Sequence, residues 1–205
     1  MTEELAAAAL PWWHDDPARL DRERAAMFAV APNLVWRFES SGRWVGHVPL
    51  WPISRRQPSG VAALVGHRAF AVKIVCGPAY PMIEPLVWPT EIKPPLSALG
   101  WTEWHLLPSA ALCLLRDKTS WDPSTLAADL VPKISGWYIE YHLKSAGYID
   151  RMTECGIAND DSLDPLLDEI DEIEGQGGGE EEQGYGEDGE DEGEVGESGG
   201  QDEGP

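Results

Sequence analysis

The sequence lacks the features of a membrane or secreted protein. It contains no stretch of about 18 consecutive apolar residues, the length that a membrane-spanning helix needs. Its first residues include Glu3 and Glu4, whereas a secretory signal begins with positive charge. The apolar stretch Leu5–Leu10 is short and runs into Pro11. We therefore expect a soluble, cytoplasmic protein with no membrane partner.

Cysteine is scarce, and no pattern of metal or nucleotide binding accompanies it. The three cysteines, Cys76, Cys113 and Cys155, are an odd number without the spacing of a disulfide framework, which predicts free thiols in a reducing compartment. The five histidines share no ligand spacing with these cysteines or with one another. The sequence also has no glycine-rich phosphate loop and no Gly-x-Ser-x-Gly elbow. We therefore expect no metal and no organic cofactor.

Basic residues are few, and the charge is unevenly distributed. Lys and Arg total 15 against 36 Asp and Glu, a formal charge of −21, of which −20 lies in residues 160–205 and −1 in the first 159 residues. Neither part offers the basic surface that nucleic-acid phosphates require, so we expect no nucleic-acid partner. A glycine-rich segment of one charge sign cannot offset an ordering cost of about 1–2 kcal/mol per residue. Gly175–Pro205 is therefore predicted to be a disordered acidic tail that keeps the protein soluble or contacts a basic partner.

Alternation of apolar and polar residues predicts an antiparallel sheet in the first half of the chain. Leu34–Glu39 and Trp44–Leu50 alternate and are separated by Ser40-Ser41-Gly42, which predicts a hairpin. Ala69–Cys76 predicts a third strand. The proline-rich segment that follows favours extended chain with at most one short strand, at Leu86–Trp88, because proline cannot donate to a strand ladder.

Helical periodicity lies on both sides of these strands. Asp16-Pro17 is typical of a helix start. The face of this first helix is predicted from residues at helical spacing: Leu20, Arg24, Met27 and Phe28. Trp121-Asp122-Pro123 repeats the start and predicts a helix that ends near Gly147, kinked or split at Pro132. A further short helix is predicted at Asp164–Glu174.

Strands grouped together between helices indicate an α+β fold. We expect one folded domain at residues 17–150, with an N-terminal helix, an antiparallel meander sheet and C-terminal helices. An N-terminal extension at 1–16 precedes it. A short helical connector at 151–174 and the tail at 175–205 follow.

Several short motifs follow this order of elements. Cys113-Leu114 follows Tyr80-Pro81 by 32 residues and precedes Trp121 by eight. The other matching motifs are Phe70-Ala71-Val72, Pro85, His105 and Trp121-Asp122-Pro123. In their joint order and spacing, residues 17–150 resemble the ubiquitin-conjugating enzymes. The resemblance implies the UBC fold, with Cys113 as the thiol that carries an acyl group.

The sequence departs from the eukaryotic members of this family upstream of the thiol. These members carry His-Pro-Asn where this chain has His105-Leu106-Leu107-Pro108, so the Asn that helps to stabilise an oxyanion is absent. The interval from His105 to Cys113 is also shorter than is usual in the family. Residues of the second half look more like the divergent bacterial members: Trp137, Tyr138, Tyr141, Ser145 and Gly147. Those members are found near antiphage cyclic-oligonucleotide synthases and in ubiquitin-like operons, so the resemblance implies a role in antiphage defence.

The resemblance also implies a reaction and its partners. Cys113 would accept a ubiquitin-like protein, or another protein's C-terminus, as a thioester and deliver it to an amine on a target. A separate activating enzyme would supply the acyl group, and a nucleotide synthase is a candidate target. His105 would donate to the oxyanion or brace the loop. Asp117, with Ser120, would orient or deprotonate the amine.

Other readings of the same residues remain open. Cys113 lies in the apolar run Ala110–Leu115, where a cysteine is often a small buried residue. Asp117 also fits a solvated surface residue without a catalytic role. Cys76 is predicted to lie in the core, and Cys155 lies beyond the domain. The chain could therefore be a catalytically inactive binding module of the same fold, or an unrelated α+β scaffold whose acidic tail is the functional part.

Overall fold

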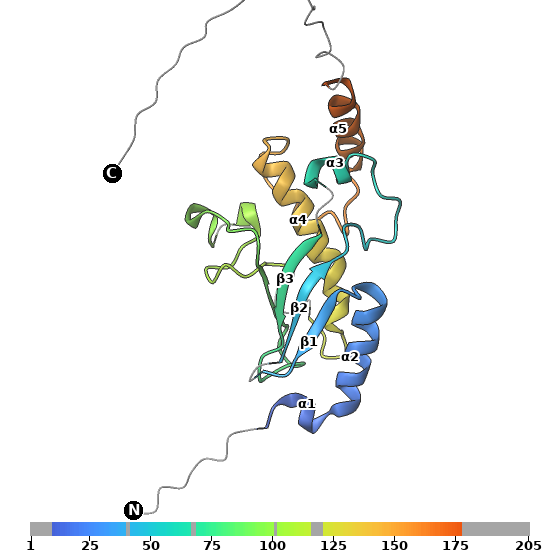
Figure 1. The fold of residues 1–205 in the computed structure, drawn as a ribbon. Coiled ribbons are helices and arrows are strands. Elements are labelled where there is room, and N and C mark those ends of the chain that lie inside the picture. Colours follow the sequence, from blue (N-terminus) through green and yellow to red (C-terminus); the bar gives the residue numbers. More distant parts are fainter. Residues whose placement is uncertain (1–9, 40–41, 67–68, 101, 116–120, 178–205) are drawn as a thin grey trace, which may run out of the picture.

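The structure is a computed structural model, shown in Figure 1, and it describes residues 10–39, 42–66, 69–100, 102–115 and 121–177. Within these residues the chain forms five α-helices and one four-stranded antiparallel sheet. The predicted α+β class is therefore confirmed. The predicted acidic tail falls almost entirely outside the described residues.

The sheet is a meander in the order β1-β2-β3-β4. Its strands are β1 (Leu34–Arg37), β2 (Arg43–Val48), β3 (Phe70–Val75) and β4 (Leu86–Pro89). Each predicted strand is confirmed, and its ends differ from the prediction by a residue or two. The alternation of apolar and polar residues was enough to predict these strands, because each strand has one buried and one more exposed face.

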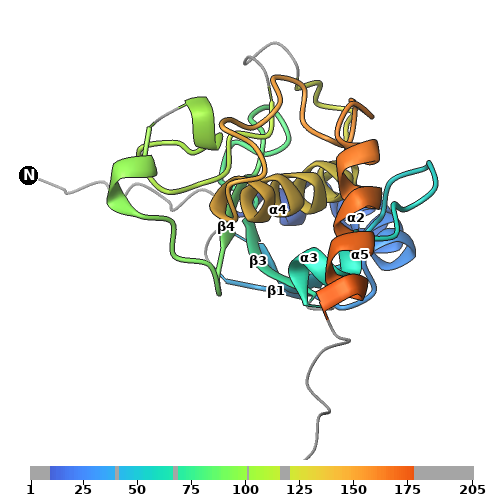
Figure 2. The ribbon, with the colours of Figure 1, turned by 90° about the horizontal axis from the view of Figure 1, so that it is seen from above.

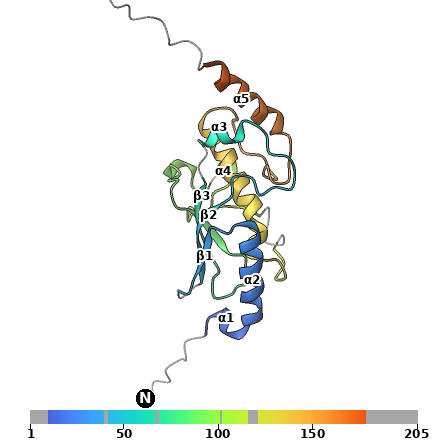
Figure 3. The ribbon, with the colours of Figure 1, turned by 45° about the vertical axis from the view of Figure 1, so that its right-hand side comes forward.

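One face of the sheet forms the centre of the core. A single row of buried side chains crosses all four strands: Trp36, Trp44, Ile74 and Val87. Helices α2 (Pro17–Val30) and α4 (Val131–Ser145) lie on the same side of the sheet (Figure 3). On that side the ring of Tyr138 from α4 stacks on Phe70, with 3.5 Å between the ring centroids. In the part of the chain that the structure describes, the sheet therefore packs against helices α2 and α4 on one face, which agrees with the α+β class.

Helix α2 begins where the sequence predicts but buries a different face. The Asp16 carboxylate accepts a hydrogen bond from the Arg19 N–H (2.8 Å), and Pro17 occupies the first turn. Phe28, predicted on the apolar face, is 73% exposed, and Arg24 is exposed as well. The buried positions are instead Arg19, Leu20, Glu23 and Met27. The prediction is therefore confirmed for Leu20 and Met27 and wrong for Arg24 and Phe28, because a buried ion pair takes two positions that the sequence pattern assigns to the surface.

The predicted N-terminal extension contains a short helix, α1 (Trp12–Asp15). Trp12 and Trp13 are buried, and both rings meet Trp36 of β1 edge to face. Gly42 leaves room for this cluster, since a Cβ there would lie 2.4 Å from the Trp13 ring. Its φ of 51° also favours glycine. The extension is therefore packed on the sheet from Trp12 onward.

Helix α4 starts later than the sequence predicts. Asp122 accepts hydrogen bonds from the Ser124 N–H and hydroxyl (2.7 and 2.5 Å), so it forms a turn rather than a helix cap. A 3₁₀ helix, η4 (Ala127–Leu130), then leads into α4. Pro132 lies in the first turn of α4, where its missing N–H breaks no helical bond. The predicted kink inside the helix is therefore wrong, whereas the predicted alternative, a split near Pro132, agrees with the change from η4 to α4 at Val131.

Helices α3 (Val61–Val65) and α5 (Asp164–Gly177) lie side by side (Figure 2). The predicted helix at Asp164–Glu174 is confirmed and extends to Gly177. The Arg55 guanidinium donates to the Asp164 carboxylate from Nε and Nη2 (2.7 and 2.9 Å), which fixes the start of α5. Two side chains of α5 are buried in the same core as the sheet: Leu167 and Ile170. Part of the segment predicted as a connector therefore belongs to the core.

The chain between β4 and the thiol is irregular apart from two 3₁₀ helices, η1 (Leu96–Ala98) and η2 (Thr102–Trp104). Trp104 is tied to α4, because its carbonyl accepts a hydrogen bond from Trp137 Nε1 (2.9 Å). Among the described residues, no helix combines the length and apolar composition that a bilayer span requires.

Candidate functional site

Cys113 ends a hairpin-like loop that starts at His105. The Cys113 N–H donates to the His105 carbonyl, and the Leu107 N–H donates to the Ala111 carbonyl, both at 2.8 Å. Leu106 and Leu112 pair as an antiparallel bridge between these bonds. The backbone hydrogen bonds therefore hold the predicted residues His105 and Cys113 opposite each other.

This loop is attached to β4. The Leu112 N–H donates to the Val87 carbonyl (2.8 Å), and Trp88 Nε1 donates to the Ser109 carbonyl (3.1 Å). Leu112 and Ala111 are buried, whereas Cys113 is only partly buried. The buried residues of the apolar run thus pack against the core, while Cys113 itself stays partly exposed.

The three cysteines have different surroundings. Cys76 is fully buried, which confirms its predicted place in the core, and Cys155 is exposed. The Cys113 Sγ lies 3.7 Å from the Leu115 carbonyl oxygen, to which its S–H donates a weak hydrogen bond. Partial burial raises the pKa of the Cys113 thiol, and the negative charge of Glu84 raises it further. The thiol is therefore mostly protonated near neutral pH, because a free cysteine with its lower pKa is only a few per cent ionised there.

Two motifs that are far apart in the sequence meet beside the thiol-bearing loop. Trp121 Nε1 donates to the Pro81 carbonyl (2.7 Å), and the rings of Trp121 and Tyr80 lie 6.1 Å apart. The Tyr80–Pro81 peptide bond is cis. Both Tyr80 and Trp121 are buried. The segment before the loop and the segment after it are therefore fixed to each other.

A buried ion pair on α2 joins both of these segments. Arg19 Nε and the Glu23 carboxylate are 2.9 Å apart, and both side chains are almost fully buried. The Arg19 guanidinium also donates to the Pro123 carbonyl (2.6 Å), the Thr125 carbonyl and the Tyr80 hydroxyl (3.0 Å). Glu23 accepts from the Tyr80 hydroxyl and from the Ala127 N–H (2.9 Å). The network of Arg19, Glu23 and Tyr80 is thus satisfied on all sides, as a buried charge pair must be.

This network was not predicted from the sequence, although one signal for it is present. Arg19 and Glu23 stand at i and i+4 in a predicted helix, a spacing at which opposite charges meet. Such pairs usually lie on the surface, and nothing in the sequence marks this one as buried. Glu84, whose charge acts on the thiol, was also missed, since its position depends on the fold of the proline-rich segment.

His105 lies at the start of the loop that ends at Cys113, and its carbonyl accepts the hydrogen bond from the Cys113 N–H. Its side chain is half-buried and its backbone has a positive φ of 47°, which is uncommon outside glycine. Burial raises the pKa of Glu140 of α4, and hydrogen bonds from Thr153 and Ile157 partly lower it again. Glu140 accepts these bonds from the Thr153 N–H and hydroxyl (2.6 and 2.9 Å) and from the Ile157 N–H. These hydrogen bonds belong to Glu140, so both roles of His105, as a brace and as an oxyanion donor, stay predictions.

The remaining predicted site residue is not placed by the structure. Asp117 lies outside the described residues, together with Ser120.

Within the described chain, no group of three or more His, Cys, Asp or Glu side chains could hold a metal ion. Comparisons of the chain with protein-family models, with curated proteins and with solved structures found no match. The functional interpretation of the site therefore rests on the geometry around Cys113.

Proposed function

We propose that this chain is an acyl carrier similar to the ubiquitin-conjugating enzymes, with Cys113 as the residue that forms the thioester. The observation that carries the proposal is the partly exposed thiol at the end of a loop whose preceding residues, Ala111 and Leu112, are buried. The order of helix, antiparallel meander, proline-rich segment, thiol and helix supports a UBC fold. The bond from Trp121 to Pro81 supports it as well, because it joins the motifs on either side of the thiol.

The proposed reaction has two steps. The deprotonated Sγ of Cys113 attacks the carbonyl carbon of a donor thioester, the donor's C–S bond breaks, and the donor thiolate takes up the proton that Cys113 released. An amine nitrogen of the target then attacks the new thioester, an amide forms, and Cys113 leaves as a thiolate while the nitrogen loses a proton. Nothing is oxidised or reduced. The first step exchanges bonds of similar energy, so the protein mainly has to position the partners.

The partners follow from this chemistry. The donor is a ubiquitin-like protein or another protein's C-terminus, delivered as a thioester by a separate activating enzyme. The second step develops negative charge on the carbonyl oxygen, which a nearby hydrogen-bond donor would stabilise. His105 is our candidate for that donor, and Asp117 is our candidate for orienting the amine. The resemblance places this activity in antiphage defence, with a nucleotide synthase as a candidate target.

A second candidate function is a catalytically inactive binding module of the same fold. The state of the thiol favours it, because burial and Glu84 both raise the pKa of Cys113. Among the described residues, no positively charged side chain offsets this effect on the thiol. In this reading the fold would scaffold partner proteins, and Cys113 would not react.

A comparison of two variants distinguishes these functions. The full-length protein would be incubated with a candidate activating enzyme, ATP and its ubiquitin-like protein, and adducts would be read by mass. We expect Cys113→Ala to form no adduct and Cys113→Ser to form an adduct that resists thiol reductant, since an oxyester is more stable than a thioester. Cys155→Ala is the matched control, because Cys155 is the more exposed thiol. An adduct that survives in Cys113→Ala would contradict the proposal, because another residue would then carry the acyl group. No adduct in any variant, with Cys113 resistant to alkylation, would favour the binding module.

A further inference from the structure

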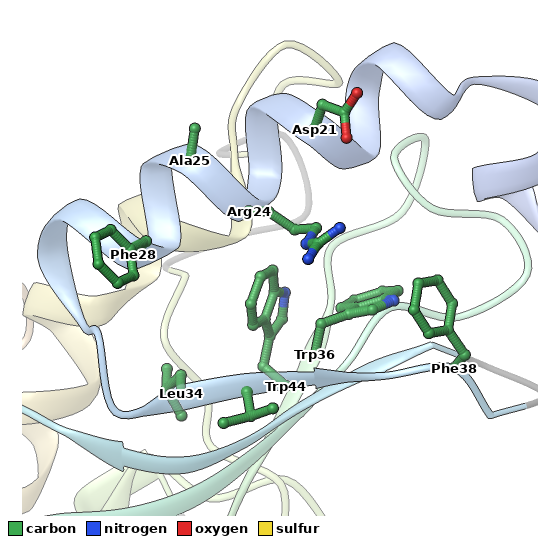
Figure 4. A pocket seen from close by; sticks show the side chains of 9 residues that line it. Asp21, Arg24, Ala25, Phe28, Leu34, Trp36, Phe38 and Trp44 are labelled. Carbon is green, nitrogen blue, oxygen red and sulfur yellow. The ribbon is translucent and has the colours of Figure 1, made fainter.

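The sheet has a second face, opposite the face on which α2 and α4 lie (Figure 3). Figure 4 shows Trp36 and Trp44 pointing from the sheet toward α2, so the residues that alternate with them along each strand point the other way. We call this second face the outer face. Val35 and Leu86 on it are 49% and 39% exposed, so the outer face is open to solvent. Two rows of residues cross its four strands: Val35, Val45, Lys73 and Trp88, and Arg37, Arg43, Val75 and Leu86.

Positive charge gathers on the outer face. Arg37 of β1 lies directly opposite Arg43 of β2, and Lys73 of β3 lies in the next row. None of the four strands contains an acidic residue. The Glu39 carboxylate pairs with Arg43, whereas Arg37 and Lys73 form no ion pair with any described residue. Like charges directly opposite each other destabilise a sheet, so a bound anion would stabilise this one.

The layout of these charges selects the chemistry of an occupant. The three cations stand on three neighbouring strands, which are about 4.8 Å apart. Lys73 Nζ lies 4.9 Å from the centroid of the Trp88 ring, on the same face. His47, which follows Arg43 by four residues on this face, already lies 3.7 Å from Glu91. An occupant should therefore carry several carboxylates at intervals of about 5–10 Å and be able to lie across the strands.

The chain itself contains such a segment. Residues 178–205 hold 12 acidic and no basic residues, and six of the acidic ones fall in residues 187–194, which we call the acidic run. Four acids of the run stand at alternate positions: Asp188, Glu190, Glu192 and Glu194. In an extended chain alternate side chains point to the same side, about 6.6 Å apart. The acidic run can therefore present a row of carboxylates at the interval that the cations of the outer face require.

The acidic run is also close enough to the outer face along the chain. Helix α5 contacts α3, and β3, which carries Lys73, begins five residues after Val65, the end of α3. The path from Gly177 along α5, across to α3 and on to Lys73 is at most about 60 Å, and the straight line between its ends is shorter. The acidic run ends 17 residues beyond Gly177, up to about 56 Å of extended chain. It can therefore reach the outer face.

We propose that the acidic run at residues 187–194 binds the outer face of the sheet in cis. Its carboxylates pair with Arg37 and Lys73 and offset the repulsion between Arg37 and Arg43. A tethered segment acts at an effective concentration of about 1 mM, so weak charge pairs are enough to hold it. A separate acidic partner of the outer face would have to compete with it. This inference is independent of the chemistry proposed for Cys113.

A spin label on the tail reads where the tail lies in the ¹⁵N-labelled full-length protein. Val195→Cys, next to the acidic run, carries the label in a background with Cys113→Ala and Cys155→Ala, and Cys76 is buried. At low salt we expect paramagnetic broadening to at least halve the amide signals of the three cationic residues of the outer face. The amide signal of Arg22, exposed on α2, should keep its intensity. Salt at about 1 M, where the Debye length is about 3 Å, should restore the lost signals.

Two tail variants separate a site from general charge attraction. The first neutralises the alternating acids of the run by Asp188→Asn, Glu190→Gln, Glu192→Gln and Glu194→Gln. Its charge-matched control carries Glu180→Gln, Glu181→Gln, Glu182→Gln and Asp202→Asn. We expect the first variant to restore the amide signals of the outer face by about two-fold or more, and the control to leave them broadened.

A pair of variants tests the sheet side. Arg37→Gln with Lys73→Gln should abolish the broadening, whereas Arg22→Gln with Arg24→Gln, both exposed on α2, should not. Broadening that is absent, or spread evenly over the domain, would overturn the proposal, as would equal restoration by both tail variants. The proposal would also be overturned if spin-labelled ¹⁴N protein broadened the outer face of unlabelled ¹⁵N protein to the same extent, because the tail would then come from a second copy.

Discussion

Replacing Arg19 by Met should destabilise the protein strongly, because it leaves a buried carboxylate without its partner. Arg19 donates to Glu23, Tyr80, Pro123 and Thr125, and all of these bonds are lost together. Glu23 is 1% exposed and keeps only its bonds from Tyr80 and the Ala127 N–H. Breaking one side of a buried pair costs about 3–5 kcal/mol. In a domain of this size that lowers the Tm by about 6–20 °C.

The assay is thermal and urea unfolding of three variants beside the wild type. Arg22→Met is the matched control, since Arg22 is exposed on the same helix, and its Tm should stay within about 2 °C of the wild type. The double variant with Arg19→Met and Glu23→Leu should be more stable than Arg19→Met alone, because no buried charge remains. A Tm for Arg19→Met within about 2 °C of the wild type would refute the reasoning.

Three further predictions concern the thiol, the sheet and the tail. Glu84→Gln removes a charge that raises the pKa of Cys113, so iodoacetamide should label Cys113 about 1.4- to 5-fold faster near neutral pH, the effect of about 0.2–1 kcal/mol. Gly46→Ala should lower stability by at least about 2 kcal/mol in urea unfolding, because φ is 143° and a Cβ would lie 2.0 Å from the Asn33 carbonyl oxygen. Deleting residues 178–205 should change the unfolding free energy by less than about 1 kcal/mol, since this acidic, glycine-rich segment contributes little apolar burial.

Each of these three predictions has a control variant or an outcome that would contradict it. Glu91→Gln, beside His47 rather than the thiol, should leave Cys113 labelling unchanged. Slower labelling in Glu84→Gln would contradict the sign of the charge effect. Gly77→Ala should be tolerated, because no atom lies within 4 Å of its Cβ and its φ is ordinary. A large loss of Tm on deletion of the tail would show that the tail is part of the fold.

The sequence predicted the sheet well because strand patterns are local. Trp44 and Val48, or Phe70 and Ile74, alternate with more exposed neighbours in a way that requires no knowledge of the rest of the chain. The helices were less predictable where a tertiary contact determines where a helix starts or which of its residues are buried. Pro132 is compatible with a helix interior only as a kink, and the structure avoids this by starting α4 beside it.

The order of the candidate site residues along the chain could be predicted from the sequence, whereas the residues that surround them in space could not. The sequence named His105 and Cys113 as candidates, and the structure joins their backbones by a hydrogen bond. The buried pair of Arg19 and Glu23 was not foreseen, because charged residues on a helix are usually solvated and only the assembled fold encloses them. The position of Asp117 stays a prediction, since it lies outside the described residues.

The most direct test of the central claim is the identity of the sulfur that carries the acyl group. The wild-type protein would be loaded by a candidate activating enzyme, ATP and its ubiquitin-like protein, then digested at low pH and mapped by mass spectrometry. We expect an adduct that reductant removes and that maps to Cys113, with Cys76 and Cys155 unmodified. An adduct that maps to Cys155, or that persists in reductant, would contradict it.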